Sequence, residues 1–180
     1  MRSIAIALLV LAQPALAAGK FSVKSSDMKE GGTLPDRSVY NGFGCSGANV
    51  SPELSWSNPP AATKSFVVTA YDPDAPTGSG WWHWVVYDIQ ASAHQLPQGA
   101  GGGTGLPEGA VQGKTDFGSA GFGGACPPPG KPHRYIFTVY ALKVDKLDVP
   151  ADASAALIGF MTHANAIASA KLMVKYGRKK

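Results

Sequence analysis

Two short segments carry the side chains that could bind or transform a ligand. The first, residues 72–76, reads Asp-Pro-Asp-Ala-Pro and is followed by His83. The second, residues 126–135, is rich in proline and ends with His133, Arg134 and Tyr135. Each segment places polar side chains where an apolar run meets prolines, and strand ends beside loops hold side chains rigidly next to open space. Together they predict a small polar pocket walled by aromatic residues and prolines.

The residue types in this pocket favour the binding of a small oxyanion. His133 and Tyr135 are two residues apart, so a strand directs both side chains to one face. Asp72 and His83 lie at or near the ends of the two apolar runs that flank the other segment. The backbone amide of Gly124 could add a donor. Phosphate and similar anions are held by several fixed hydrogen-bond donors of this kind. We therefore expect Asp72, His83, His133, Tyr135 and Gly124 to bind the ligand.

Residues in and near these segments could also form an ion pair, bind a metal or act as nucleophiles. Asp74 with Arg134 is expected to form a structural ion pair that supports the pocket. Two aspartates and two histidines could hold a divalent metal, but the proline-locked turn of residues 72–76 directs its carboxylates apart. Serines are available as nucleophiles, but none lies in a nucleophile-elbow pattern. We expect no metal, no cofactor and no catalytic activity.

The elements that position these residues are mostly strands. Residues 65–71, 81–89 and 134–142 are rich in β-branched and aromatic side chains, and residues 21–23 and 53–56 are shorter strands. Residues 153–168 repeat apolar side chains at helical spacing, and from residue 171 the period changes to two. The expected fold is mainly β: an antiparallel two-sheet β-sandwich with a C-terminal helix and a final short strand.

The beginning of the chain resembles an export signal. Arg2 precedes an apolar run at residues 4–11, and Ala15-Leu16-Ala17 is a small-residue cleavage pattern. We expect residues 1–18 to be a signal peptide and residues 20–178 to form one domain. The apolar run is too short for a permanent membrane span. The expected location is therefore periplasmic or secreted, with no stable membrane span after signal removal.

Charge and cysteine content narrow the functional class. The formal net charge of +4 comes from scattered basic residues without interleaved aromatics, so a nucleic-acid partner is not expected. Cys45 and Cys126 are the two cysteines, and a pair in an exported protein favours a disulfide. In the chain-entropy estimate such a bridge stabilises by roughly 4 kcal/mol. Two free thiols near one site remain the alternative.

Several motifs resemble the phosphatidylethanolamine-binding protein family, also called Raf kinase inhibitor-like proteins, in its bacterial branch. They lie at residues 45–52 with Leu54 and Trp56, then at 72–76, 83–86, 109–113, 116–118, 126–140 and 176–178, in the family's order. The resemblance implies two packed antiparallel sheets and an anion pocket for phosphate-like head groups. By motif, Asp72, His83, His133 and Tyr135 match the pocket, and Asp74 with Arg134 matches its support.

These observations predict an exported non-enzymatic binding protein with a small anion pocket for phosphate-like or phospholipid head-group ligands. The alternative is a protein-interaction module that inhibits a protease or another exported partner. In that case the loops at 91–130 would matter more than the acidic residues of the pocket.

Overall fold

The computed structural model describes residues 19–179; the predicted signal peptide at 1–18 lies outside the described residues. The strands are β1 Ser22–Lys24, β2 Asn41–Gly42, β3 Cys45–Ser46, β4 Leu54–Ser57, β5 Ser65–Asp72, β6 Trp81–Gln90, β7 Gln95–Leu96, β8 Val111–Gln112, β9 His133–Leu142 and β10 Ala166–Tyr176. The helical elements are α1 Ala155–Asn165 and the 3-10 turns Asp36–Ser38 and Ala100–Gly102. None of these described helices has the length and hydropathy of a transmembrane span.

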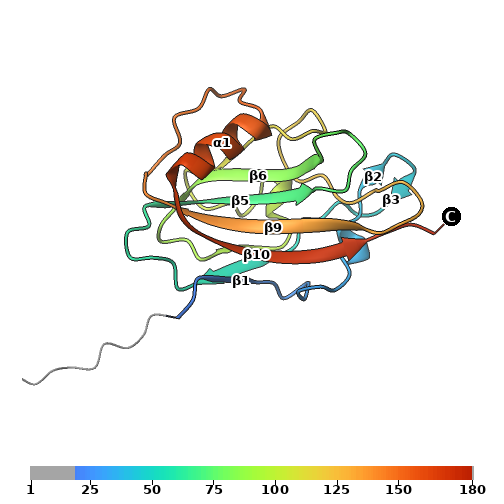
Figure 1. Ribbon diagram of the computed structural model, residues 1–180, viewed down its shortest axis with the longest axis horizontal. Helices are drawn as coiled ribbons and strands as arrows, with labels where there is room; N and C mark the ends of the chain where they lie inside the picture. The colour runs from blue at the N-terminus through green and yellow to red at the C-terminus, as the bar shows by residue number, and fades with distance from the viewer. Residues whose placement is uncertain (1–18, 180) are drawn as a thin grey trace, which may run out of the picture.

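A five-stranded antiparallel sheet dominates the fold, with strand order β10-β9-β5-β6-β8 (Figure 1). A three-stranded sheet has the order β1-β4-β7, and β2 with β3 forms a separate hairpin. β5 occupies the centre, and every residue in it except Tyr71 is buried. Within it, Val68 pairs with Val86 of β6 and Val139 of β9. The predicted mainly β fold with packed antiparallel sheets is confirmed.

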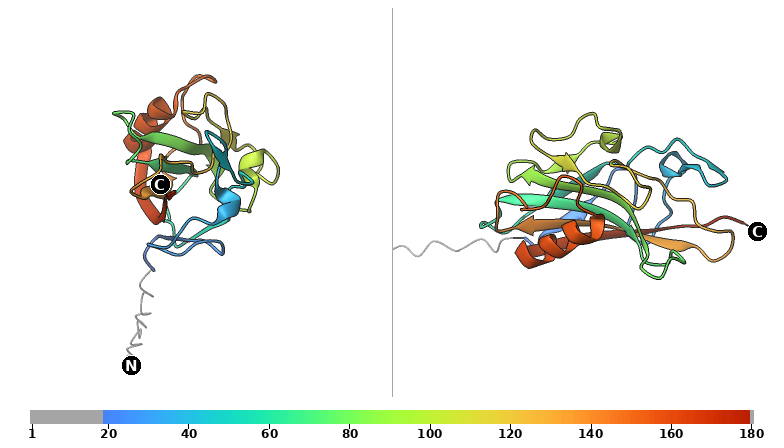
Figure 2. Two further views of the ribbon diagram at one scale, coloured as in Figure 1. Left: turned by 90° about the vertical axis from the view of Figure 1, so that its right-hand side faces the viewer. Right: turned by 90° about the horizontal axis from the view of Figure 1, so that it is seen from above.

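The two faces of the five-stranded sheet bury different partners. On one face Phe66, Trp84 and Phe137 join a core that includes side chains of the three-stranded sheet. On the other face Val67 and Val85 pack with residues of α1. Successive side chains of a strand point to opposite faces, so α1 and β1 lie on opposite sides of the sheet (Figures 1 and 2). Each face is thereby covered, and the sheet is held rigid for the site at its end.

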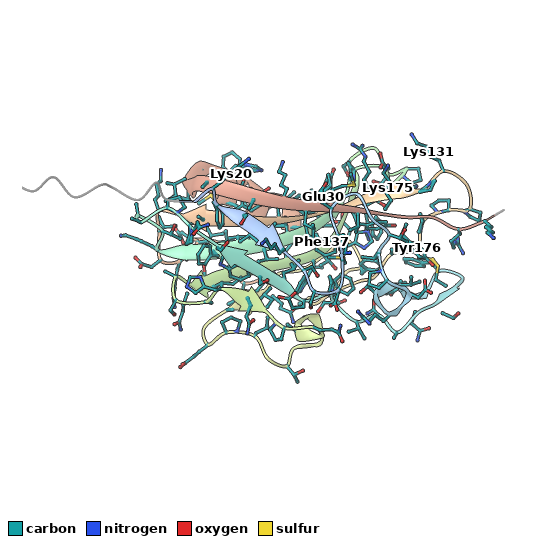
Figure 3. All side chains as sticks on the ribbon, turned by 90° about the horizontal axis from the view of Figure 1, so that it is seen from below. Lys20, Glu30, Lys131, Phe137, Lys175 and Tyr176 are labelled. Atoms are coloured by element: carbon teal, nitrogen blue, oxygen red, sulfur yellow. A yellow bond between two sulfur atoms is a disulfide. The ribbon has the colours of Figure 1, made fainter. Side chains whose placement is uncertain are left out.

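Figure 3 contrasts the interior with the margin of the molecule. Phe137 is fully buried among the side chains between the sheets. Lys20, Lys131 and Lys175 are exposed at the periphery. These lysines thus stay in solvent while aromatic and aliphatic side chains fill the core.

The C-terminal elements differ from the sequence prediction. α1 begins after Ser154, whose hydroxyl accepts a hydrogen bond from the Leu157 amide at 3.2 Å, but it ends at Asn165 rather than near residue 168. β10 follows at once and is 11 residues long, so the final strand is not short. Ala166 and Ala168 pair with residues of β9, and these sheet hydrogen bonds override the helical preference of alanine.

The apolar spacing in the helix also indicated the wrong buried side. Phe160 is 69% exposed and Leu157 39% exposed, whereas Ile158 and Thr162 are buried against the sheet. The helix therefore leaves part of its apolar surface in solvent.

Candidate functional site

The two polar corners converge at one end of the five-stranded sheet. β5 ends at Asp72 and the neighbouring antiparallel strand β9 begins at His133, so the two residues lie side by side. β6, on the other side of β5, begins at Trp81, which pairs with Asp72 and brings His83 to the same end. Side chains 61 residues apart in the sequence thus meet, because the C-terminal end of an antiparallel strand lies beside the N-terminal end of its neighbour.

A cavity of about 160 Å³ opens between these corners. Four of the predicted binding residues, Asp72, His83, His133 and Tyr135, are part of its wall. The other wall residues are apolar, proline or small: Phe43, Ala75, Pro76, Thr77, Trp81, Phe117, Cys126, Pro127 and Pro128. The predicted combination of a few polar groups with aromatic and proline walls is present.

Asp72 and His133 form a buried hydrogen-bonded pair. His133 Nδ1 lies 2.7 Å from Asp72 Oδ2, and the side chains are 12% and 4% exposed. The other carboxylate oxygen of Asp72 accepts a hydrogen bond from the Asp74 amide at 2.8 Å. An ionised carboxylate only accepts, so Nδ1 of His133 donates. This leaves Nε2 of His133 without a partner among the described residues.

His83 is fixed in a similar way by a backbone carbonyl. Its Nδ1 lies 2.7 Å from the Gly123 carbonyl oxygen, and the residue is buried. Burial lowers the pKa of His83, while the Gly123 hydrogen bond and the charge of Asp72 act in the opposite direction. A buried imidazole without a hydrogen-bonded counter-charge favours its neutral form.

Tyr135 contributes a phenol to the cavity wall. Its hydroxyl is buried and has no hydrogen-bond partner among residues 19–179. Burial, with a further contribution from the charge of Asp72, raises the pKa of Tyr135, so the hydroxyl keeps its proton. An unpaired buried hydroxyl costs stability, and such groups mark positions where a ligand or water completes the bonding.

The predicted ion pair between Asp74 and Arg134 is confirmed. Asp74 Oδ2 accepts from the Arg134 amide at 2.9 Å and from its Nε at 2.8 Å, and Oδ1 accepts from a terminal guanidinium nitrogen at 2.7 Å. The Arg134 guanidinium holds the pKa of Asp74 well below its usual range. Neither residue is part of the cavity wall. The pair instead ties the loop after β5 to the start of β9.

Gly124 does not occupy the predicted position. Its amide donates to the side-chain oxygen of Asn49 at 2.6 Å, and the residue is absent from the cavity wall. The amide of neighbouring Gly123 donates to the His83 carbonyl at 2.8 Å. Both amides are therefore engaged within the protein, and the expectation that Gly124 offers a donor to the ligand is wrong.

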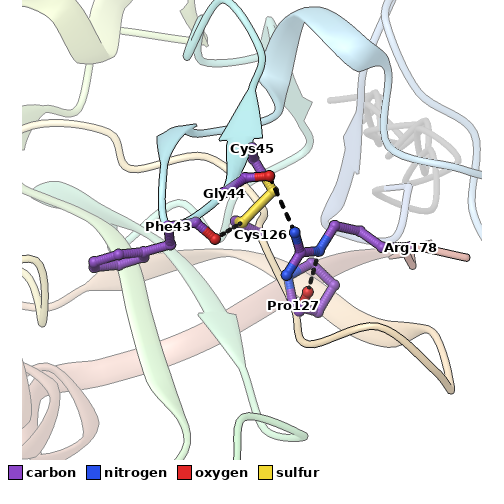
Figure 4. The surroundings of a disulfide bond; sticks show 6 residues. All are labelled: Phe43, Gly44, Cys45, Cys126, Pro127 and Arg178. Carbon is purple, nitrogen blue, oxygen red and sulfur yellow. Dashed lines mark hydrogen bonds between the residues drawn. A yellow bond between two sulfur atoms is a disulfide. The ribbon is translucent and has the colours of Figure 1, made fainter. Parts of the chain in front are cut away.

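A disulfide closes one side of the site. Cys45 and Cys126 are bonded, which joins the β2–β3 hairpin to the proline-rich loop before β9 (Figure 4). Arg178 reinforces this junction, because its guanidinium donates to the carbonyls of Pro127 at 2.7 Å and Gly44 at 3.1 Å. The two covalently joined segments supply Phe43 and Cys126 to the cavity wall. The disulfide alternative for the two cysteines is the one the structure contains.

Sequence reasoning missed three aromatic residues of the wall. Phe117 packs against Trp81 and His83 with ring centroids 5.4 Å apart in each case. Phe43 stacks on Phe117 with centroids 6.0 Å apart and is itself 68% exposed. Trp81 adjoins the His83 motif and Phe117 lies in the family motif at residues 116–118, so both could have been identified, whereas Phe43 lies in a loop without a local signal.

Metal binding finds no site in the described part of the chain. Within residues 19–179, no three His, Cys, Asp or Glu side chains gather in a way that could hold a metal ion. The imidazoles of His83 and His133 instead form hydrogen bonds within the protein.

Known proteins share both the sequence and this architecture. YbcL of Escherichia coli strain K12 is 56% identical over 162 residues, which cover 88% of each chain. YbhB of the same strain is 53% identical over 153 residues, covering 84% of this chain and 97% of YbhB. The crystal structure of E. coli YbcL superposes with a TM-score of 0.87 at 55% identity, covering 89% of this chain and all of that one.

A more distant structure has the same fold. CT736 of Chlamydia trachomatis, described as a putative phosphatidylethanolamine-binding protein homologue, superposes with a TM-score of 0.73 at 30% identity. The sequence model of the family described as phosphatidylethanolamine-binding protein matches residues 24–177, which include every residue of the cavity wall. The chain therefore belongs to the phosphatidylethanolamine-binding protein family.

Proposed function

We propose that this protein is an exported, non-enzymatic binding protein whose cavity takes a small oxyanion, such as phosphate or the head group of a phospholipid. The observation that carries the proposal is the pair of imidazoles in the cavity wall. Each has Nδ1 engaged by a protein acceptor, Asp72 for His133 and Gly123 for His83. Each therefore keeps its second ring nitrogen for another partner, and the unpaired hydroxyl of Tyr135 belongs to the same cavity wall.

Preorganisation supports this use of the site. The two imidazoles are oriented before any ligand arrives, so binding does not have to order them. The carboxylate of Asp72 is already engaged by His133 and the Asp74 amide, which reduces its repulsion of an anion. The unpaired hydroxyl of Tyr135 then donates to an anionic oxygen, and such charge-assisted hydrogen bonds are among the strongest.

The size of the cavity favours a head group over a larger molecule. Its volume of about 160 Å³ lies below the ~300–1,000 Å³ of usual small-molecule sites. Phe43, 68% exposed beside the cavity, offers an apolar surface for the rest of a ligand whose anionic end is inside.

The wall of the cavity contains no serine, and its described cysteine and threonine are already engaged, which supports binding without catalysis by a thiol or an aliphatic hydroxyl. Among the described wall residues, the sulfur of Cys126 is in the disulfide and the hydroxyl of Thr77 donates to the Gly80 carbonyl. Nucleophilic catalysis needs such a group beside a base. A screen with phosphomonoester, phosphodiester and carboxylic ester substrates is expected to give no turnover above that of the His83→Asn variant.

Export is supported by the disulfide, since such bonds persist in oxidising compartments. The leader pattern in the first 18 residues agrees with it. Fractionation of cells producing the full chain should recover the protein, shortened at its N-terminus, outside the cytoplasm. Recovery of uncleaved protein in the cytoplasm alone would contradict export.

Titration with inorganic phosphate tests the binding proposal directly. Isothermal titration calorimetry of the purified protein should detect binding that is lost or weakened by at least about tenfold in His133→Ala, the loss expected when one hydrogen bond to a charged ligand is removed. His94→Ala is the matched control, because His94 is exposed and outside the cavity wall. Unchanged affinity in His133→Ala would reject the site.

A further inference from the structure

The hydrogen bond of His83 fixes which ring nitrogen can accept. Its Nδ1 faces the Gly123 carbonyl oxygen at 2.7 Å, and a carbonyl oxygen only accepts hydrogen bonds. Nδ1 therefore carries a proton in every protonation state of the ring. In the neutral imidazole the lone pair is then on Nε2, on the side of the ring away from Gly123. His83 thus presents an acceptor to the cavity.

Burial of His83 keeps this acceptor unprotonated at neutral pH, although the charged groups around it favour protonation. Asp72 from β5 and Asp116 from the loop before β9 both favour the cation through their charges. Asp72 is hydrogen-bonded to His133, and the Tyr135 ring contacts His83 edge-on with centroids 5.1 Å apart. Burial is the largest influence and outweighs both carboxylates, so the pKa of His83 is lowered.

On the basis of the proposed oxyanion site, we propose that the cavity selects oxyanions that still carry a proton, namely monoprotonated phosphate and phosphomonoesters, over sulfate and phosphodiesters. The P–OH group of such a ligand donates to His83 Nε2. Another phosphoryl oxygen accepts from the Tyr135 hydroxyl, which has no partner among the described residues. One site thereby matches both the donor and an acceptor of a single ligand group.

Sulfate and phosphodiesters have no proton to donate near neutral pH. In this cavity an oxygen of either one meets the lone pair of His83, unless the buried imidazole takes up a proton against the effect of burial. A buried acceptor that faces another acceptor loses the equivalent of one hydrogen bond. The expected difference in affinity is about tenfold or more.

Two ligand pairs measure this selectivity. Isothermal titration calorimetry at pH 5.5, below the second pKa of phosphomonoesters at about 6, compares phosphate with sulfate, and phosphoethanolamine with glycerophosphoethanolamine, which share an ethanolamine group but are a monoester and a diester. The first member of each pair is expected to bind at least about tenfold more tightly. The second pair also distinguishes a free phosphorylated metabolite from the head group of a diester lipid.

The variant His83→Asn isolates the acceptor. The asparagine amide can keep the hydrogen bond to Gly123, but the atom corresponding to Nε2 is gone. The preference for phosphate over sulfate should then fall to about onefold. His94→Asn, at an exposed position outside the cavity wall, should retain the wild-type preference.

The pH dependence of the wild type gives a second measurement that needs no variant. Phosphoethanolamine affinity should rise as the pH falls towards the second pKa of the phosphomonoester, about 6, and level off below it. Sulfate affinity should show no levelling at that pH. A phosphoethanolamine affinity that is flat between pH 8 and 6, or equal wild-type affinities for the two members of each pair, would overturn this inference. Equal affinities would leave the proposed binding function intact, whereas binding of none of the four ligands would overturn both.

Discussion

Removal of the Tyr135 hydroxyl is expected to raise the stability of the protein and to weaken phosphate binding. In Tyr135→Phe the ring remains and only a buried hydroxyl without a described partner is removed. The unsatisfied group costs the folded protein about 1–3 kcal/mol, so its removal should raise the free energy of unfolding by about 1–2 kcal/mol. For a domain of this size each kcal/mol corresponds to about 2–4 °C in Tm.

The matched control is Tyr71→Phe. The Tyr71 hydroxyl donates to the Ser79 carbonyl at 2.8 Å, so the same chemical change here removes a satisfied hydrogen bond. This variant should lose about 0.5–1.5 kcal/mol. Urea unfolding of the three proteins in a phosphate- and sulfate-free buffer gives the comparison. The expected order of stability is Tyr135→Phe, wild type, Tyr71→Phe.

The same Tyr135 variant should bind phosphate more weakly. Loss of one hydrogen bond to a charged oxygen costs about 1.5–3 kcal/mol, or roughly a 10- to 150-fold increase in Kd. A Tyr135→Phe protein that is destabilised as much as Tyr71→Phe would refute the reasoning, because the hydroxyl would then have a partner in the unliganded protein.

Three further perturbations test other contacts of the site. Replacing Cys45 and Cys126 by serine opens a loop of 81 residues and should lower the unfolding free energy by about 4 kcal/mol, measured in urea against the oxidised wild type. Because burial lowers the pKa of His83, the unfolded chain binds that proton more readily than the folded protein. The resulting contribution to stability is full above about pH 6.5 and declines below it, so His83→Asn should show a smaller loss of Tm between pH 7 and pH 5, and an equal loss would contradict the shift. Gly123→Ala places a Cβ 2.2 Å from the Phe117 ring and should cost about 1–3 kcal/mol in thermal unfolding, whereas an unchanged Tm would show that the ring can move freely.

The central strands could be predicted because their local and tertiary signals agree. β5, β6 and β9 are rich in β-branched and aromatic residues and are also the most buried strands of the sheet. At residues 166–170 the two signals conflict. Alanine there favours a helix, and only pairing with β9, which is remote from the local pattern, makes the segment a strand.

The polar part of the site could be predicted because it sits where strongly predicted strands begin and end. Asp72 and His133 flank prolines, and antiparallel neighbours bring such ends together. The hydrogen-bond partner of the Gly124 amide could not be predicted in this way. Its acceptor, the side chain of Asn49, is 75 residues away in a loop. Phe43 and Phe117 likewise reach the cavity through contacts between loops, which local periodicity does not report.

The junction formed by Arg178 links the C-terminus to ligand access. Its guanidinium spans the carbonyls of Gly44 and Pro127, on the two segments that the disulfide also joins. A carboxypeptidase that removed Arg178 would remove these hydrogen bonds while leaving the disulfide in place. The hairpin carrying Phe43 would then keep the disulfide but lose the guanidinium contacts, so removal of Arg178 would loosen the entrance to the cavity without touching any residue of its wall.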